Sequence, residues 1–169
     1  MHRVFTQPMA VPGAGTRCPV RKSAMNPSPT PVTEDEVLAA AAALVEAFGA
    51  TRTDEYFAAF SADATFVFHT EDRRLDSRAE YEALWNSWLA DGWSVTACRS
   101  SDIRVQLLGD EAAVFSHTVH TTAGAADARE TAVERETIVF ARRDGRLLAV
   151  HEHLSALSAS AQPSAGADA

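Results

Sequence analysis

The stretch that most constrains the fold is residues 134–155, which read ERETIVFARRDGRLLAVHEHLS. Two runs rich in β-branched and apolar residues flank Arg143-Asp144-Gly145, where glycine can adopt a positive φ, and this pattern predicts a β-hairpin. The densest group of ionisable side chains in the predicted fold lies on this hairpin: Glu134, Glu136, His151, Glu152 and His153. We therefore expect the rest of the chain to build a wall that faces the hairpin.

At 169 residues the chain has the length of one domain with a single core. Residues 1–32 are rich in Pro, Gly and Ser and show little periodicity, so we expect a disordered leader there, and likewise a disordered Ala/Ser tail at 156–169. The folded domain is expected at residues 33–155. The leader holds four of the 15 basic residues and none of the 23 acidic ones, so the rest of the chain is strongly acidic. Such a domain repels phosphate backbones, and nucleic-acid binding is not expected.

The sequence shows neither the continuous apolar stretch of a signal peptide nor a run of membrane-spanning length. These features predict a cytoplasmic protein without a membrane partner. Met25 offers an alternative start to Met1, and the choice between them stays open. Cys18 in the leader and Cys98 in a predicted strand form neither a disulfide framework nor a metal-binding spacing. Cys98 is expected to be a buried, inert thiol.

Periodicity predicts helices followed by a run of long strands. Thr33 with Glu36 and Ser77 with Glu80 have the spacing of capping boxes, which open predicted helices over 33–48 and 78–90. A shorter helix is expected over 54–60. Predicted strands cover 64–70, 94–108 with a bulge at 99–102, 112–121, and the two arms of the hairpin. This order predicts an α+β fold in which N-terminal helices wrap a strongly curved, cone-shaped antiparallel sheet.

The order of these elements, together with LLGDEAAVFSHTV at 107–119 and the hairpin sequence, resembles the SnoaL-like branch of the nuclear transport factor 2-like superfamily. Within it, the chain is most similar to the association (hub) domain of calcium/calmodulin-dependent kinase II. The superfamily holds small enzymes as well as non-catalytic oligomerisation domains, so the resemblance implies a pocket and a homodimer or larger homo-oligomer, but no single reaction. The arginines with which the hub pocket holds carboxylates fall on Val119, Ile138 and Leu154, which implies a more apolar ligand.

The length of the hairpin turn determines which ionisable groups share a face of the sheet. A three-residue loop with Gly145 as a bulge pairs Glu136 with Glu152, whereas a two-residue loop pairs Glu136 with His153. The resemblance favours the three-residue loop. The pocket face then carries Glu134, Glu136, Ile138, Glu152 and Leu154 from the hairpin, with Phe115 and His117 from the neighbouring strand.

Three residues of this face are the predicted catalytic group. Two carboxyl groups that face each other in an apolar cavity cannot both ionise easily, so the pKa of one should rise, and a nearby imidazole can share the proton. We therefore expect His117 and Glu136 to form a proton-transfer pair that Glu152 orients, as general acid–base catalysis near neutral pH requires. The alternative is that these acids lie at a cavity rim or dimer interface, hydrogen-bonded and without catalytic function.

Seven apolar side chains are the predicted substrate-binding walls: Phe66, Phe68, Trp85, Phe115, Val119, Ile138 and Leu154. Each aromatic residue can instead belong to a solid core. The expected function is that of a small-molecule pocket protein, namely a cofactor-free isomerase, cyclase, dehydratase or hydrolase that acts on a compact apolar substrate. The alternative is a non-catalytic ligand-binding or oligomerisation module.

The histidines also suggest a metal site. His151 and His153 lie on one face of a predicted strand, and His69 ends another strand, so the three could offer nitrogen ligands to zinc, copper or iron. A single strand histidine is more often hydrogen-bonded in a core or an interface than bound to a metal. We therefore predict no metal, and name these three residues as the ligands if one is bound.

Overall fold

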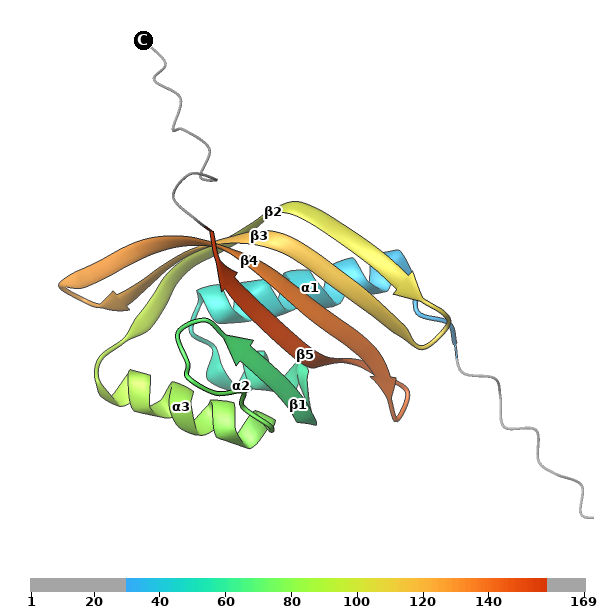
Figure 1. Ribbon diagram of the computed structural model, residues 1–169, viewed down its shortest axis with the longest axis horizontal. Helices are drawn as coiled ribbons and strands as arrows, with labels where there is room; N and C mark the ends of the chain where they lie inside the picture. The colour runs from blue at the N-terminus through green and yellow to red at the C-terminus, as the bar shows by residue number, and fades with distance from the viewer. Residues whose placement is uncertain (1–29, 158–169) are drawn as a thin grey trace, which may run out of the picture.

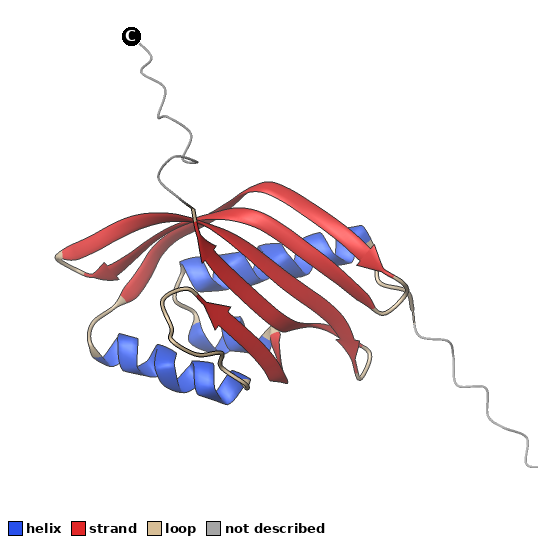
Figure 2. Ribbon diagram, in the orientation of Figure 1, coloured by secondary structure: helices blue, strands red, loops and turns tan. Residues whose placement is uncertain are grey.

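The computed structural model describes residues 30–157 (Figure 1). Three helices lie against one face of a five-stranded sheet (Figure 2). The helices are α1 (Glu34–Gly49), α2 (Thr53–Ala58) and α3 (Arg78–Ala90), and the strands are β1 (Phe60–Phe68), β2 (Ser94–Leu108), β3 (Ala112–Ala125), β4 (Ala128–Arg143) and β5 (Arg146–Ala156). This arrangement confirms the predicted α+β fold. Most of the predicted leader, with Cys18 and both possible starts, and most of the predicted tail lie outside the described residues.

Both long helices begin where the capping residues predict. The Thr33 hydroxyl accepts a hydrogen bond from the Glu36 amide at 3.3 Å, and the Ser77 hydroxyl accepts one from the Glu80 amide at 3.2 Å. Each contact satisfies one of the backbone N–H groups that a helix start leaves without a partner. Among residues 30–157, none of the helices has the length and apolar character needed to cross a membrane.

The strands are ordered β1-β5-β4-β3-β2 across the sheet. Neighbours from β5 to β2 run antiparallel, but β1 runs parallel to β5, so the sheet is mixed rather than fully antiparallel. The segment with α3 carries the chain from β1, at one edge, to β2, at the other edge (Figure 1). The predicted bulge in β2 is confirmed, because the register shifts between Ser101 and Arg104.

The turn of the β4–β5 hairpin differs from the favoured prediction. Asp144 and Gly145 both have positive φ, 51° and 78°, and Arg143 pairs with Arg146 across them. A two-residue turn with positive φ at both central positions matches the right-handed twist of the flanking strands. The predicted three-residue loop is therefore wrong.

A bulge further along β5 changes the register again. Val150 is an extra residue between two successive strand pairs, so that Glu136 pairs with Leu154 and Ile138 with Glu152. Neither predicted partner of Glu136 is found. Side chains alternate between the two faces of the sheet along a strand. One extra residue at Val150 therefore turns the same β5 side chains toward the pocket as one extra residue in the turn would. The five hairpin side chains predicted for the pocket face consequently do share one face.

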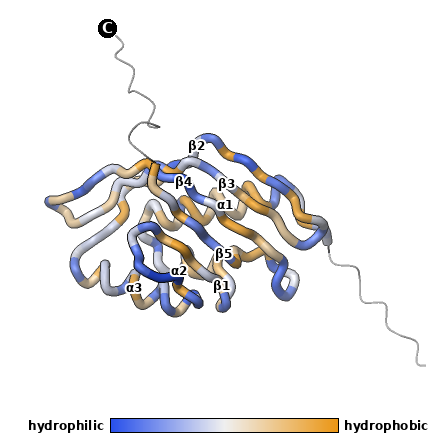
Figure 3. Tube along the Cα trace, viewed as in Figure 1, coloured by the Kyte–Doolittle hydropathy of each residue, from blue (hydrophilic) through white to orange (hydrophobic). Residues whose placement is uncertain are grey.

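The helices and the sheet enclose an aromatic core. Trp85 is fully buried, stacks on Tyr56 with ring centroids 5.3 Å apart, and donates a hydrogen bond from its indole nitrogen to the Thr53 hydroxyl at 2.9 Å. Outside the core, Figure 3 shows hydrophobic and hydrophilic residues alternating along β2. Three large apolar side chains of this edge strand are about half exposed: Ile103, Leu107 and Leu108.

Candidate functional site

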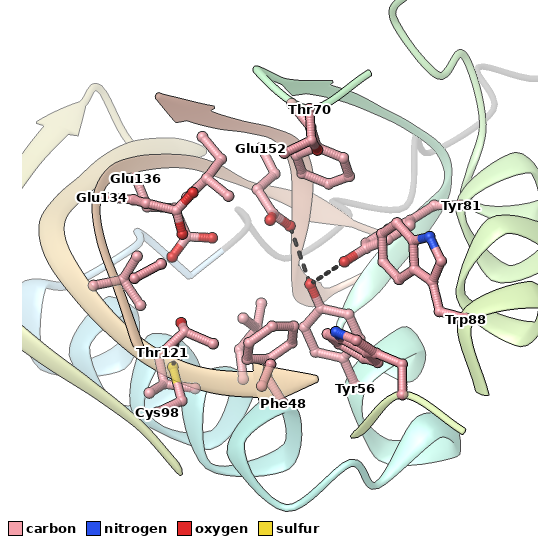
Figure 4. A pocket seen from close by; sticks show the side chains of 18 of the residues that line it. Phe48, Tyr56, Thr70, Tyr81, Trp88, Cys98, Thr121, Glu134, Glu136 and Glu152 are labelled. Atoms are coloured by element: carbon pink, nitrogen blue, oxygen red, sulfur yellow. Dashed lines mark hydrogen bonds between the residues drawn. The ribbon is translucent and has the colours of Figure 1, made fainter. Parts of the chain in front are cut away.

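A cavity of about 490 Å³ lies between the sheet and the helices, and all three helices and all five strands contribute side chains to its walls. This volume falls in the range of about 300–1,000 Å³ that is usual for small-molecule sites. Its aromatic lining consists of Phe48, Tyr56, Phe68, Tyr81, Trp88 and Trp93. Figure 4 shows the carboxyl groups of Glu136 and Glu152 turned toward this space from β4 and β5.

Glu152 is the most deeply buried of the cavity acids, with 3% of its surface exposed. The Tyr56 hydroxyl lies 3.3 Å from its Oε2 atom (Figure 4). Burial first, and then the negative charge of neighbouring Glu136, hold the pKa of Glu152 well above its usual value of 4.5. The carboxyl group of Glu152 is therefore protonated at a higher pH than an exposed glutamic acid.

Glu136 has a different partner. Its Oε2 atom lies 2.5 Å from Nε2 of His117, and Nδ1 of His117 lies 2.8 Å from the Ser100 hydroxyl. The His117 side chain is fully buried and does not line the cavity, so it contacts Glu136 on the side away from the cavity. The bulge in β2 lies opposite His117 in the sheet, next to Ser100. The predicted contact between His117 and Glu136 is thus present, with Glu136 alone facing the cavity.

Two tyrosine hydroxyls lie next to the carboxyl group of Glu152. The sequence did not predict them as site residues. Tyr56 and Tyr81 lie with their oxygen atoms 3.3 Å apart, and burial raises the pKa of both well above 10. Both hydroxyls therefore stay neutral and can donate hydrogen bonds. Each residue sits in an apolar helical stripe, which predicts core. The one feature of the sequence that could have indicated a polar site is the tyrosine hydroxyl, because a buried hydroxyl usually needs a hydrogen-bond partner.

The predicted walls divide between the cavity and the core. Phe68, Val119 and Leu154 line the cavity. The others do not line it and are at most 1% exposed in the hydrophobic core: Phe66, Trp85, Phe115 and Ile138. Helical and strand periodicity identifies which face is buried, but both the core and the cavity wall are buried on that face. Phe48, Trp88 and Trp93 complete the aromatic wall.

Cys98 also lines the cavity, where burial raises the pKa of its thiol to about 11. A thiol with so high a pKa is almost entirely protonated at neutral pH, and the thiolate is the nucleophilic form. The inert character predicted for Cys98 therefore agrees with its environment, although the residue is only partly buried.

The three histidines named as possible metal ligands do not meet. Nε2 of His69 lies 2.5 Å from Oε1 of Glu134, at the cavity side of the sheet. His151 and His153 alternate with the inward-facing Glu152; Nδ1 of His151 lies 2.8 Å from the Thr65 hydroxyl, and His153 is exposed. Within residues 30–157, no group of three or more His, Cys, Asp or Glu side chains has the arrangement of a metal site.

Comparisons with known proteins bear on the family and the fold of the chain. Residues 37–159 match the model of the family described as SnoaL-like domain. A comparison with curated proteins gives no match. Among solved structures, the chain is similar to an NTF2-like protein of unknown function in nutrient uptake from Rhodospirillum rubrum, with 18% identity, a TM-score of 0.63, and coverage of 73% of this chain and 100% of that chain.

Two further solved structures resemble the kinase hub. One is a putative calcium/calmodulin dependent protein kinase II association domain from Xanthomonas campestris, with 20% identity, a TM-score of 0.57, and coverage of 73% of this chain and 84% of that one. The other is a CaMKII hub homology domain from Chlamydomonas reinhardtii, with 23% identity, a TM-score of 0.60, and coverage of 73% and 97%. These likenesses confirm the fold that the sequence predicts.

Proposed function

The chain belongs to the SnoaL-like family, and on this premise we propose that its cavity binds a compact, largely apolar molecule and transfers a proton on it without a cofactor. One observation carries the proposal: Glu136 and Glu152, both buried, enter the same aromatic cavity with different partners. A buried carboxyl group whose pKa is raised can act as an acid beside a second carboxyl group that acts as a base. The reaction class is isomerisation, cyclisation, dehydration or hydrolysis.

Glu136 is the proposed base. Its Oε2 atom is engaged by His117, and the carboxyl group lines the cavity, where it can accept a substrate proton. His117 does not reach the cavity, and we assign it a positioning role. A hydrogen bond from the imidazole fixes the orientation of the carboxylate, and correct orientation is a requirement for efficient proton transfer.

Glu152 is the proposed acid, and Tyr56 and Tyr81 support it. When Glu136 removes a proton from a carbon next to a carbonyl group, negative charge moves to the carbonyl oxygen. A protonated Glu152 can donate a hydrogen bond to that oxygen, while the Tyr56 hydroxyl, which donates to Oε2 of Glu152 and contacts the Tyr81 hydroxyl, orients the acid. Return of the proton from Glu136 to another carbon completes an isomerisation, with no electron donor or acceptor consumed.

The base can be tested without knowledge of the natural substrate. The probe is 5-nitrobenzisoxazole, a compact apolar molecule; removal of its ring C–H proton breaks the N–O bond and gives a nitrile and a coloured phenolate. We expect the protein to accelerate this reaction, and Glu136→Gln to lower the rate at least about a hundredfold, because general base catalysis is typically worth 10²–10⁴. The measurement is the initial rate at which the coloured phenolate appears.

Glu111→Gln is the matched control, because it removes one carboxylate from an exposed turn outside the cavity. Its rate should equal that of the unchanged protein. Thermal melting of both variants checks that each is folded. A rate that is no faster than buffer, or a rate that Glu136→Gln leaves unchanged, would contradict the proposed base.

A second candidate function is that of an assembly module. The observation that favours it is the exposed apolar group Ile103, Leu107 and Leu108 on the edge strand β2. Edge strands expose unpaired backbone groups, and an apolar edge favours association with another chain. Two of the similar structures are named as kinase association or hub domains. A homodimer that uses this strand is compatible with the enzymatic proposal as well.

A further inference from the structure

All the charged side chains that line the cavity are acidic. The five are Glu71, Glu130, Glu134, Glu136 and Glu152. Within the described part of the chain, no arginine lines the cavity, and residues 30–157 contain no lysine. A ligand in this cavity therefore meets carboxyl groups and aromatic rings, but no basic side chain that could hold an anion.

The cavity keeps a negative charge when its neighbours are counted. Glu152 can be neutral by protonation, and the imidazoles of His69 and His117 can each offset one further carboxylate, those of Glu134 and Glu136. Glu71 and Glu130 form no ion pair with any residue of 30–157. Arg73 lies close enough to Glu71 to interact with its charge, but no basic side chain of residues 30–157 lines the cavity, so the lining itself stays acidic. A cleft lined by one sign of charge concentrates ions of the opposite sign.

Aromatic rings form the opposite side of the cavity. The rings of Trp88 and Trp93 have centroids 5.4 Å apart, and that of Tyr81 lies 6.2 Å from Trp88. In Figure 4, Tyr81 and Trp88 lie across the cavity from Glu134 and Glu136. Aromatic faces attract cations through their quadrupole, and indole is the strongest of the side-chain rings in this respect. They also offer apolar area to the body of a ligand.

We propose that the ligand of this cavity is an organic cation, a compact amine whose ammonium group lies toward Glu134 and Glu136 and whose apolar body lies on the tryptophan side. This inference rests on the proposed function, because it specifies the ligand of the same cavity. It changes the expectation from a purely apolar molecule to one with a single positive charge. Repulsion from the acidic lining should make a carboxylate of the same size the weakest ligand.

Three probes of nearly equal shape test the charge of the ligand: 3-phenylpropylamine, 3-phenylpropanol and 3-phenylpropanoate. Each is titrated into the full-length untagged chain at neutral pH. Binding is followed by calorimetry and by tryptophan fluorescence, since Trp88 and Trp93 line the cavity. We expect the amine to bind about tenfold more tightly than the alcohol, which is the order of one cation–π or ion-pair contact, and the carboxylate to bind most weakly.

Variants locate the effect in the cavity. Glu134→Gln and Glu136→Gln should each reduce the preference for amine over alcohol severalfold, whereas Glu111→Gln should leave it unchanged. The ratio of the two affinities is measured within one protein preparation, so a partly destabilised variant still reports the preference. Two glutamate variants are used so that the test does not depend on Glu136 alone, whose carboxyl group also contacts the buried His117.

The outcomes distinguish failure of the cationic ligand from failure of the small-molecule cavity. An alcohol that binds as tightly as the amine, or a carboxylate that binds more tightly, overturns the cationic ligand but leaves a small-molecule cavity in place. An amine preference that persists in both glutamate variants also overturns the inference, because the cation is then held elsewhere. If none of the three probes binds, the ligand cavity itself is contradicted, and the inference fails with it.

Discussion

Glu136 and Glu152 are the same residue type on adjacent strands, and their neighbours make them different. Glu136 contacts an imidazole, whereas Glu152 contacts a phenol supplied by Tyr56. The pairing of two acids with a histidine could be predicted from the alternation of side chains along the hairpin. Which acid has the raised pKa could not, because burial in the folded cavity is the first cause of the raised pKa of Glu152, and the hydrogen bond from Tyr56, 96 residues earlier in the chain, acts in the opposite direction.

The raised pKa of Glu152 makes the stability of the fold depend on pH. Below pH 4.5 the side chain is neutral in the folded and unfolded states, and it contributes no difference. As pH rises from 4.5 to the folded-state pKa, the unfolded chain loses this proton while the folded chain keeps it, so the free energy of unfolding falls. Above the folded-state pKa both states are ionised and the full loss persists.

We therefore predict that Glu152→Gln gains stability relative to the unchanged protein as pH rises above 4.5. The gain is about 1.4 kcal/mol for each unit by which the folded-state pKa exceeds the unfolded one. Urea unfolding of both proteins at pH values from 4 to 9 measures it. Two curves that stay parallel over this range would mean that Glu152 ionises as easily in the folded protein as in the unfolded chain.

At the scale of elements, the hairpin shows what local sequence can and cannot decide. Asp144-Gly145 is a strong signal for a two-residue turn. The bulge at Val150 carries no comparable signal, because valine is an ordinary strand residue and the extra position is set by pairing on both sides of β5. The predicted pairings were therefore wrong. The predicted set of side chains on the pocket face was right, because one extra residue in β5 and one extra residue in the turn place the same side chains on the same face of the sheet.

The helices were easier to predict than the role of their side chains. The capping residues and the apolar spacing predict that α3 begins at Arg78 and ends at Ala90, and the structure agrees. The same spacing does not separate Trp85, which is in the core, from Trp88, which lines the cavity one turn later. Whether a buried face meets another side chain or an empty space depends on the curvature of the sheet, and local sequence does not encode it.

For the whole molecule, the order of helices and strands together with the family resemblance predicted the fold. The parallel pairing of β1 with β5 was not predicted, because it requires β1 to join the far edge of a sheet whose other strands come later in the chain. The acidic composition of the domain predicts that nucleic acid is not a partner. The same charge, concentrated in the cavity, supports the proposed cationic ligand.

The proposed homodimer makes a prediction at this scale. We expect light scattering to give the mass of two chains, and Ile103→Asp with Leu107→Asp to give the mass of one, because a charge buried in an apolar interface is strongly unfavourable. Ala126→Asp, in the exposed turn between β3 and β4, is the control that adds charge elsewhere. A single-chain mass for the unchanged protein, or a variant that still associates, would exclude β2 as the interface.

The measurement that tests the central claim most directly is a pH titration of the glutamate side-chain carboxyls by NMR, with ¹³C-labelled glutamate. We predict one carboxyl whose pKa lies well above 4.5, whose signal is missing in Glu152→Gln and whose pKa falls in Glu136→Gln as the neighbouring charge is removed. It should stay above 4.5 in Glu136→Gln, because burial is the larger cause. A spectrum in which every glutamate titrates near its usual value would contradict a shared cavity of paired carboxyl groups.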